Sequence, residues 1–227
     1  MKILALDAAT EACSAALQFD GEVIHRFEVA PQQHSQKLLP FVDELLAEAG
    51  IKLQQLDGLA YGQGPGSFTG VRIGVAITQG LAFGADLPVV GVSSLATMAQ
   101  QVISEKNAEQ VITAIDARMA EIYLGYYQNQ NGLATLMEQE RVLKPDEVQP
   151  LQQMTATAFS AGTGWVTYQE VLSAKFAISD GQVELPNAKF MLPLAEALFS
   201  ANASTDAEHA QPNYVRDEVS WQKLPGR

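Results

Sequence analysis

The order of hydrophobic and polar positions predicts three strands and a helix at the start of the chain. Short apolar runs occupy residues 2–8, 12–19 and 22–29, and Asp20-Gly21 between the last two is typical of a β-hairpin turn. Apolar residues then recur at helical spacing over residues 34–49, and the glycine at position 50 ends this amphipathic helix.

Strands and helices continue to alternate up to residue 103. A strand ends near Gly62, a helix covers residues 71–83, a strand covers residues 88–92, and a further helix begins with Ser93 or Ser94 as its cap. The first half therefore has the order strand, strand, strand, helix, strand, helix, strand, helix.

The same order begins again after the polar residues 105–107. A duplicated βββαβαβα unit is the architecture of the actin, sugar kinase and heat-shock-70 ATPases, so we expect this α/β fold. We place an N-terminal subdomain at residues 1–106 and a degenerate C-terminal subdomain with a tail at residues 107–227. The polar stretch 202–211 is expected to be a mobile loop. The predicted strands of the second half are 110–116, 121–128, 133–142 and 155–161, and its predicted helices are 164–172 and 188–200.

A glycine-rich segment at residues 62–74 joins the fourth predicted strand to the next helix, and two interpretations of it stay open. Free amides at a helix N-terminus attract phosphate or another anion. Alternatively, the glycines let the helix pack close to another backbone. The segment lacks the lysine of a P-loop and comes too late in the chain for a dinucleotide fingerprint. The residues of this glycine loop that we single out are Gly64, Gly66, Ser67, Thr69 and Arg72.

Composition describes a globular protein of 227 residues, 47% hydrophobic and 18% charged. The single cysteine, Cys13, excludes an intramolecular disulfide and is expected to be buried in a strand, as in a reducing compartment. No apolar run approaches the ~20 residues of a membrane span, so we expect a cytoplasmic protein. The net charge of −12 argues against direct nucleic-acid binding and suits a basic protein partner.

Four segments and part of the tail together resemble the TsaB (YeaZ) family. The match is strong over the first 125 residues, and the run Gly-Pro-Gly-Ser-Phe-Thr-Gly-Val-Arg-Ile-Gly is highly specific. The matching stretches are ILALDAATEACSAA (3–16), HSQKLLP (34–40), GPGSFTGVRIG (64–74), DARMAEIY (116–123) and the tail residues Pro212, Tyr214 and Arg216.

The resemblance implies a role in making threonylcarbamoyladenosine at the tRNA adenosine beside the anticodon. In that family a TsaD transferase carries the chemistry, a TsaE ATPase joins the assembly, and the TsaB subunit is catalytically silent. The resemblance therefore implies that this chain requires no cofactor of its own, that its partners use ATP and metal, and that tRNA is met only indirectly.

No metal site is expected in this chain. TsaD-type relatives hold a metal with two histidines four residues apart on the helix after the fifth strand, and Ser94 and Met98 stand at those positions here. Neither side chain binds such a cation with useful affinity. The three histidines, His25, His34 and His209, have no histidine partner at ligand spacing, and His34 is expected to cap or begin a helix.

The nucleotide cleft is expected to be degenerate. The turn at residues 116–121 lacks the Gly-Gly pair of active relatives, so its side chains would crowd a phosphate. Arg118 faces an anion, faces a partner carboxylate, or forms only a surface salt bridge. The residues of this cleft are Asp7, Thr10, Glu11, Asp116, Arg118, Gly162 and Gly164.

Three other classes of function stand as alternatives to a catalytically silent subunit. An active small-molecule kinase or ATPase on the same fold would bind MgATP and depend on Asp7. A hydrolase would need Asp7 and Asp116 as paired carboxylates, and the chain has no His-Glu-x-x-His motif. A direct tRNA-binding module is disfavoured by the charge.

The scaffold hypothesis uses helices 34–49 and 70–84 as a dimer face. Small residues would let two helix pairs approach closely, in a homodimer when the chain is alone and in a heterodimer when TsaD is present. Gly74→Leu is expected to overpack this contact. The expected interface residues are Leu38, Leu39, Val42, Leu45, Gly70, Val71, Gly74, Ile77, Thr78 and Leu81.

Overall fold

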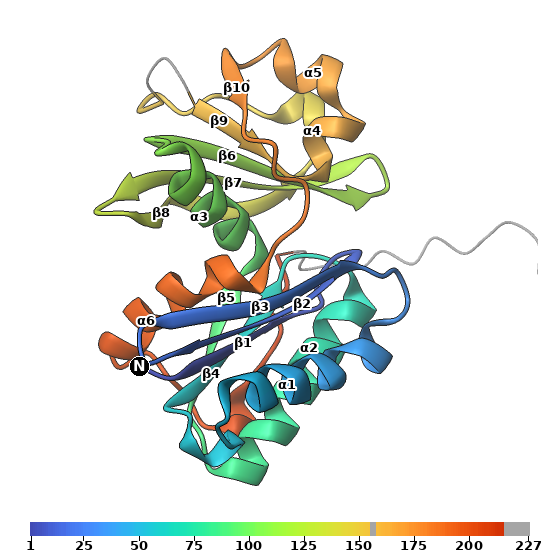
Figure 1. Cartoon of the computed structure of the whole chain (residues 1–227). Coiled ribbons are helices and arrows are strands. Elements are labelled where there is room, and N and C mark those ends of the chain that lie inside the picture. The colour runs from blue at the N-terminus through green and yellow to red at the C-terminus, as the bar shows by residue number, and fades with distance from the viewer. Residues whose placement is uncertain (155–157, 216–227) are drawn as a thin grey trace, which may run out of the picture.

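Two five-stranded sheets, one above the other in Figure 1, form the framework of the protein. The structure is a computed structural model that describes residues 1–154 and 158–215. The first sheet has the order β3-β2-β1-β4-β5. Its strands are β1 (Ile3–Asp7), β2 (Ala12–Phe19), β3 (Glu22–Val29), β4 (Gly58–Gly64) and β5 (Val89–Ser93).

The predicted antiparallel meander at the start of the chain is confirmed. β1 pairs with β2 and β2 with β3 in antiparallel register, whereas β4 and β5 run parallel to β1. Asp20 and Gly21 both have positive φ, 47° and 86°, as the tight turns that suit the twist of a hairpin require. The turn sequence therefore sets the register in which β2 meets β3.

Helices α1 (His34–Ala49) and α2 (Phe68–Ala85) cover one face of the first sheet (Figure 1). The predicted bounds of α1 are confirmed, because Gly50 adopts the left-handed conformation that ends a helix. Pro40 lies in the second turn of α1 at an exposed position. Helix α2 begins earlier than predicted, because Ser67 caps it by accepting a hydrogen bond from Gly70 N at 3.3 Å.

The second sheet repeats the topology of the first, with the order β10-β9-β6-β7-β8. In both sheets three consecutive antiparallel strands are followed by two strands parallel to the first of them. The predicted duplication is thereby confirmed at the level of strand order. The strands are β6 (Gln110–Arg118), β7 (Glu121–Gln130), β8 (Leu133–Leu143), β9 (Ala158–Ala161) and β10 (Ile178–Asp180).

The helices of the second half are shorter than predicted. The segment expected as one helix at 164–172 forms α4 (Thr163–Thr167) and α5 (Gln169–Ser173), which are separated at Tyr168. The segment expected as a helix from residue 188 begins with a 3₁₀ turn and becomes α6 (Leu192–Ser200), with Pro193 in its first turn. Of the strand expected at 155–161, the part at 155–157 lies outside the described residues.

Two helices pack on the sheet of the other half. Helix α3 (Ser94–Lys106) contributes Leu95, Met98 and Val102 to a cluster with residues of β6 and β7 in the second sheet. Helix α6 packs on the face of the first sheet opposite α1 and α2, in a cluster that includes Ala195. A division of the chain at residue 106 therefore separates the two sheets. It does not separate the helices by sheet, because each half contributes a helix that covers the sheet of the other half.

Residues 202–211, expected to be a mobile loop, follow a path along the first sheet that is held by hydrogen bonds. Thr205 pairs with Val89 in an antiparallel bridge, and the side chain of Gln79 donates to the carbonyl of Ala210 at 3.0 Å. Backbone donors and acceptors of a loop that lies against a sheet need partners, and these contacts supply them at Thr205 and Ala210. The segment carries the chain back to the glycine loop.

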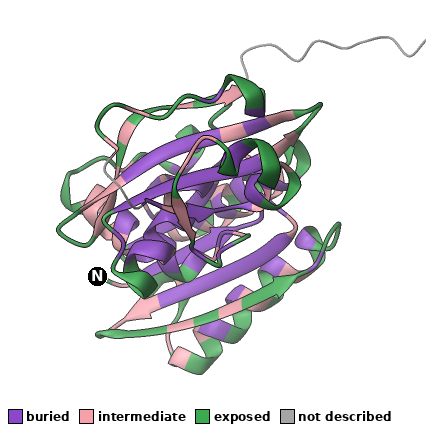
Figure 2. Cartoon of the chain, turned by 90° about the horizontal axis from the view of Figure 1, so that it is seen from above, coloured by how far each residue is buried: buried purple, intermediate pink, exposed green. Residues whose placement is uncertain are grey.

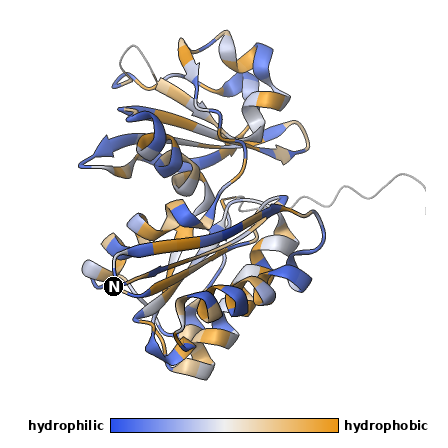
Figure 3. Ribbon diagram, in the orientation of Figure 1, coloured by the Kyte–Doolittle hydropathy of each residue, from blue (hydrophilic) through white to orange (hydrophobic). Residues whose placement is uncertain are grey.

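Buried residues run along the strands of both sheets (Figure 2), and along α1 hydrophobic and hydrophilic residues alternate (Figure 3). Cys13 is fully buried in β2, as predicted, and burial raises the pKa of its thiol to about 11. Among the described residues, no helix is long and apolar enough to span a membrane.

Candidate functional site

A cleft of about 1450 Å³ lies between the two halves of the protein. The first half lines it with the β1–β2 turn, the loop before α1 and the glycine loop. The second half lines it with the β6–β7 turn and the start of α4. The predicted cleft residues Thr10, Glu11, Asp116 and Arg118 lie in its wall, as do Gly66, Ser67 and Arg72 of the glycine loop.

The glycine loop packs against the backbone of the β1–β2 turn. A Cβ atom added at Gly66 would overlap the carbonyl oxygen of Ala9, and one added at Gly70 would overlap that of Ala8. The close-packing interpretation is therefore correct for these two positions, and the neighbouring backbone belongs to the same chain.

Amides that could bind an anion at this helix N-terminus already have partners. Ser67 N donates to the Ala9 carbonyl at 2.7 Å, and Val71 N donates to the Ser67 carbonyl at 2.9 Å. The side-chain oxygen of Ser67 accepts a hydrogen bond from the amide of Gly70. The alternative interpretation of the loop as a phosphate cradle therefore lacks these three donors.

Arg72 is held between aromatic rings beside the glycine loop. Its guanidinium carbon lies 3.2 Å from the ring centroid of Phe68 and 5.0 Å from that of Tyr214, and its Nη1 donates to the Phe68 carbonyl at 3.0 Å. Cation–π contact of this kind is worth about 0.5–1 kcal/mol at exposed sites. Arg72 thus joins α2 to the segment at 213–215.

Asp7 lies behind the cleft wall rather than in it. Its side chain is 1% exposed, its Oδ1 accepts from Ala9 N at 2.9 Å, and no described residue donates to its Oδ2. That oxygen lies against Gly62, where a Cβ atom would overlap it. Burial raises the pKa of Asp7 to about 7. Asp7, expected as a residue of the degenerate cleft, is therefore set back from its lining residues, because glycine at position 62 leaves a space that the carboxyl group fills.

The β6–β7 turn keeps a glycine-like backbone without glycine. Arg118, Met119 and Ala120 have φ values of 64°, 54° and 58°, a region that residues with a Cβ atom rarely adopt. The first two of these residues, Arg118 and Met119, line the cleft where active relatives were expected to have a Gly-Gly turn.

Arg118 forms ion pairs across the mouth of the cleft. Its guanidinium lies 3.2 Å from Glu11 of the first half and 3.3 Å from Asp116 of the second half, and its side chain is 75% exposed. An exposed pair of this kind contributes about 0–1 kcal/mol. The surface salt bridge, one of the alternatives for Arg118, is therefore present within the chain.

Gly162 and Gly164 allow their turn to pack closely against β6. A Cβ atom at either position would meet Ala114 of β6, and Gly162 has a φ of 104°. Between them, Thr163 accepts a hydrogen bond from Asp116 N at 3.1 Å with its hydroxyl oxygen. This turn is thereby tied to β6 behind the cleft.

The residues that stand where a metal would be held are fully buried. Ser94 and Met98 are both 0% exposed. His34 is 7% exposed, and its Nε2 lies 3.1 Å from the Ala12 carbonyl oxygen, so it ties the start of α1 to β2 as a structural residue.

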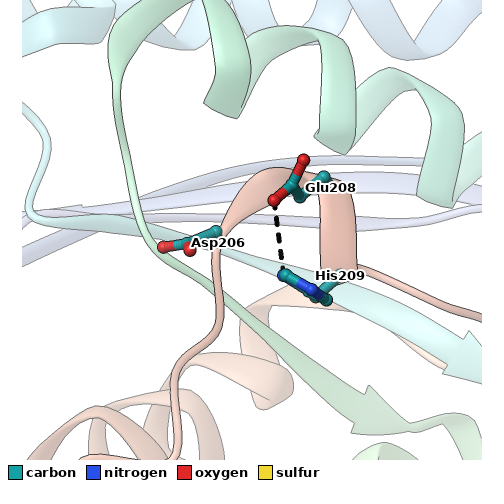
Figure 4. Close-up of side chains that lie close together, drawn as sticks. All are labelled: Asp206, Glu208 and His209. Atoms are coloured by element: carbon teal, nitrogen blue, oxygen red, sulfur yellow. Dashed lines mark ion pairs between the residues drawn. The ribbon is translucent and has the colours of Figure 1, made fainter.

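A cluster of Asp206, Glu208 and His209 was missed by the sequence analysis, which compared only histidines with one another. Potential ligand atoms of the three side chains lie within 4.8 Å of one another on the 3₁₀ turn at Ala207–His209 (Figure 4). All three are exposed, and His209 already pairs with Glu208 at 4.0 Å. Such acidic groups are common on surfaces, and nothing else around them indicates a ligand.

A hydrogen-bond network at the junction of the two halves was also missed. Glu140 of β8 accepts hydrogen bonds from the hydroxyl groups of Ser93 and Tyr127, and burial raises the pKa of Glu140. Ser93 also caps α3 by accepting from Leu95 N at 3.1 Å. One carboxylate therefore connects the end of β5, the start of α3 and the second sheet.

Most of the predicted interface residues face the interior of their own half. Leu39 is 44% exposed, and Ile77 and Leu81 are half-buried. The prediction for the others is wrong, because this is the side of each helix that packs on the first sheet. Gly74→Leu would accordingly meet Ala8 inside the chain. The buried members are Leu38, Val42, Leu45, Gly70, Val71, Gly74 and Thr78.

The outward side of α2 is apolar as well. Ala76, Gly80, Phe83 and Gly84 are exposed, Phe83 to 84%. No atom lies within 4 Å of a Cβ added at Gly80 or Gly84. The four-residue spacing of these two glycines is the sequence signal that marks this side.

Comparison with known proteins gives the family. The family model of tRNA N6-adenosine threonylcarbamoyltransferase (TsaD) matches residues 27–223. The chain is 47% identical over its whole length to the complete tRNA threonylcarbamoyladenosine biosynthesis protein TsaB of Escherichia coli. It is 44% identical to TsaB of Haemophilus influenzae, over 100% of this chain and 98% of that one. The crystal structure of YeaZ from Pseudomonas aeruginosa superposes with a TM-score of 0.88 at 44% identity, covering 94% of this chain and 99% of that one. The duplicated fold, the glycine loop and these full-length likenesses place the chain in the TsaB family, whose members act in the biosynthesis of threonylcarbamoyladenosine in tRNA.

Proposed function

We propose that the chain is a non-catalytic subunit that binds a TsaD-type transferase and supports threonylcarbamoyl transfer to the tRNA adenosine beside the anticodon. The observation that carries the proposal is the outward side of α2, where Phe83 is 84% exposed and open space surrounds Gly80 and Gly84. Small residues let another helix approach the backbone closely, and an exposed aromatic side chain supplies contact area.

The cleft residues support a role without catalysis. The two positions that correspond to the metal-binding histidines of TsaD-type relatives hold Ser94 and Met98, both 0% exposed. The carboxyl group of Asp7 is buried against Gly62. ATP and metal are then used by the partner subunits, and this chain needs no cofactor of its own.

The same face serves two assemblies that exclude each other. A second copy covers it in a homodimer when the chain is alone, and the TsaD-type partner covers it in the heterodimer, through which a TsaE-type ATPase is reached. With a net charge of −12 the chain meets tRNA only through these partners, in the cytoplasm.

The test is light scattering on Gly80→Leu, alone and mixed with the TsaD protein of the same organism. Gly80 has free space around it, so the variant folds, but the larger side chain keeps a facing helix from close approach. Both assemblies should dissociate to monomers. The matched control is Ser104→Leu, at an exposed position of α3, which packs on the second sheet; it should keep both assemblies.

A Gly80→Leu chain that still forms both dimers would show that the outward side of α2 is not the interface. A wild-type chain that stays monomeric and does not bind TsaD would contradict the scaffold proposal itself. MgATP hydrolysis by the wild-type chain, lost in Asp7→Ala, would favour the kinase or ATPase alternative.

A further inference from the structure

Strand β3 is the outer strand of the first sheet, and it differs from the other three sheet edges. At the opposite edge, Val89 of β5 is bridged to Thr205. In the second sheet, β10 has three residues, and the pairing of β8 is interrupted by two register shifts. β3 has eight residues, pairs with β2 without a shift and contains no proline. Short, bulged or covered edges resist pairing with a further strand, whereas a long and regular edge permits it.

The backbone of β3 offers hydrogen-bonding groups on its outer side. The two-residue turn at 20–21 makes the residues that flank it a hydrogen-bonded pair, so alternate residues from Val23 onward point their N–H and C=O groups away from β2. Within the described part of the chain, one hydrogen bond reaches these groups, from Arg26 Nη1 to the His25 carbonyl at 3.2 Å. The residues that point outward are Val23, His25, Phe27 and Val29.

The side chains of the same four residues form an exposed row on the side of β3 opposite to α1, because side chains alternate along a strand. Three of them are apolar: Val23 and Phe27 are each 41% exposed, and Val29 is 57% exposed. Burial, nearby Lys189 and Arg26 lower the pKa of His25, so this side chain is neutral near pH 7. An added strand with apolar side chains on this side would cover the row.

The side of β3 that faces α1 carries more negative than positive charge. Arg26 pairs with Glu44 and Glu48 of α1, each at 2.7 Å. Lys37 of α1 pairs with a carboxylate of β3 at 2.8 Å. Four carboxylates therefore surround two cations, and each cation is already paired. The charged residues are Glu22, Arg26 and Glu28 of β3 and Lys37, Glu44 and Glu48 of α1.

This charge favours a basic occupant. Opposite charges on neighbouring strands attract, so basic side chains of an added strand would be stabilised beside α1. A second copy of the chain, with its own net charge of −12, would be repelled.

We propose that β3 binds an extended segment of a partner protein as a sixth strand of the first sheet. Apolar side chains of the segment cover Val23, Phe27 and Val29, and its alternate, basic side chains lie beside the carboxylates of β3 and α1. The main chain of the segment bonds to the outward N–H and C=O groups of β3. This goes beyond the scaffold role and does not depend on it.

Hydrogen exchange with a capped eight-residue peptide of alternating valine and lysine tests the proposal. The four outward amides of β3 should exchange roughly tenfold more slowly in its presence, because the added strand accepts their hydrogen bonds. The amides between them already bond to β2 and should change little. A peptide of alternating valine and glutamate should bind roughly tenfold more weakly, because its charges face the carboxylates.

Phe27→Lys should weaken binding of the valine–lysine peptide roughly tenfold, because it removes an apolar contact and places a like charge at the edge. Val29→Lys provides a second variant, and circular dichroism checks the fold of each. Val171→Lys is the matched control, because it makes the same change of charge at a 39% exposed position of α5 in the second half. It should bind the peptide as wild type does.

Equal binding by all three variants would overturn the proposal, because attraction between a basic peptide and an acidic chain would then suffice. Equal binding of the two peptides, or unchanged exchange at the four outward amides, would also overturn it. Slower exchange at these amides with rising protein concentration and no peptide would assign the edge to a second copy, against the proposal.

Discussion

Asp7 lies behind the wall of the cleft, and its surroundings change the chemistry of its carboxyl group. Its carboxyl group lies at the end of β1, where it is 1% exposed with one oxygen against Gly62. A charge in such surroundings loses its hydration, which is why burial raises the pKa of Asp7 to about 7. Motif analysis singled out Asp7, but the burial of its side chain depends on the residues that pack around it.

The pH dependence of stability should report the burial of Asp7. Its pKa is about 7 in the folded chain and near 3.8 otherwise, so its contribution to stability is fully present below about pH 4 and is lost as pH rises through about 7. Between about pH 5.5 and pH 8 the loss is roughly 2 kcal/mol. Urea unfolding should show that Asp7→Asn lacks this part of the pH dependence.

Asp43→Asn provides the control, because Asp43 is exposed on α1. This variant should keep the wild-type pH dependence. If Asp7→Asn loses stability between the two pH values as much as wild type does, Asp7 is already charged in the folded chain.

At the scale of elements, helix α2 has two apolar sides with different partners. Gly70 on the inward side meets the Ala8 carbonyl, whereas Gly80 on the outward side has free space. Glycine spacing identified α2 as a close-packing helix. It did not tell which side meets the sheet, because both sides carry small and apolar residues, and this is why most of the predicted interface residues proved to be buried.

Two substitutions of glycine by alanine should therefore change stability in opposite directions. Gly70→Ala forces a Cβ atom onto the Ala8 carbonyl and should lower the free energy of unfolding by about 1–3 kcal/mol. Gly80→Ala meets nothing and should raise it by about 0.5–1 kcal/mol, because alanine favours helix. Chemical denaturation measures both, and changes of the same sign would contradict the assignment of the two sides.

At the scale of the whole molecule, the two halves exchange covering elements. Helix α3 leaves the first sheet at Ser93 and packs on the second, while α6 returns to the first. The network of Ser93, Glu140 and Tyr127 lies where α3 crosses over. The Glu140 side chain thereby joins the end of β5 and the start of α3 to the second sheet.

Removal of this carboxylate should weaken the junction. Glu140→Ala leaves the hydroxyl of Tyr127, which is 1% exposed, without its acceptor and should cost about 1–3 kcal/mol of unfolding free energy. Glu140→Gln keeps an acceptor oxygen and should cost less. Hydrogen exchange at the start of α3 should increase in Glu140→Ala; unchanged exchange would assign the crossing to the apolar contacts of α3 alone.

The sequence by itself determined the features that rest on local chemistry. The order of strands and helices, the Asp20-Gly21 hairpin and the end of α1 at Gly50 follow from periodicity and turn residues, and four segments with part of the tail together suggested the family. Only the tertiary structure decided which side of α2 is buried, where Asp7 points and which sheet α3 and α6 cover. These features depend on contacts between segments far apart in the chain, where several apolar surfaces compete for the same face, and local pattern carries no information on which of them is buried.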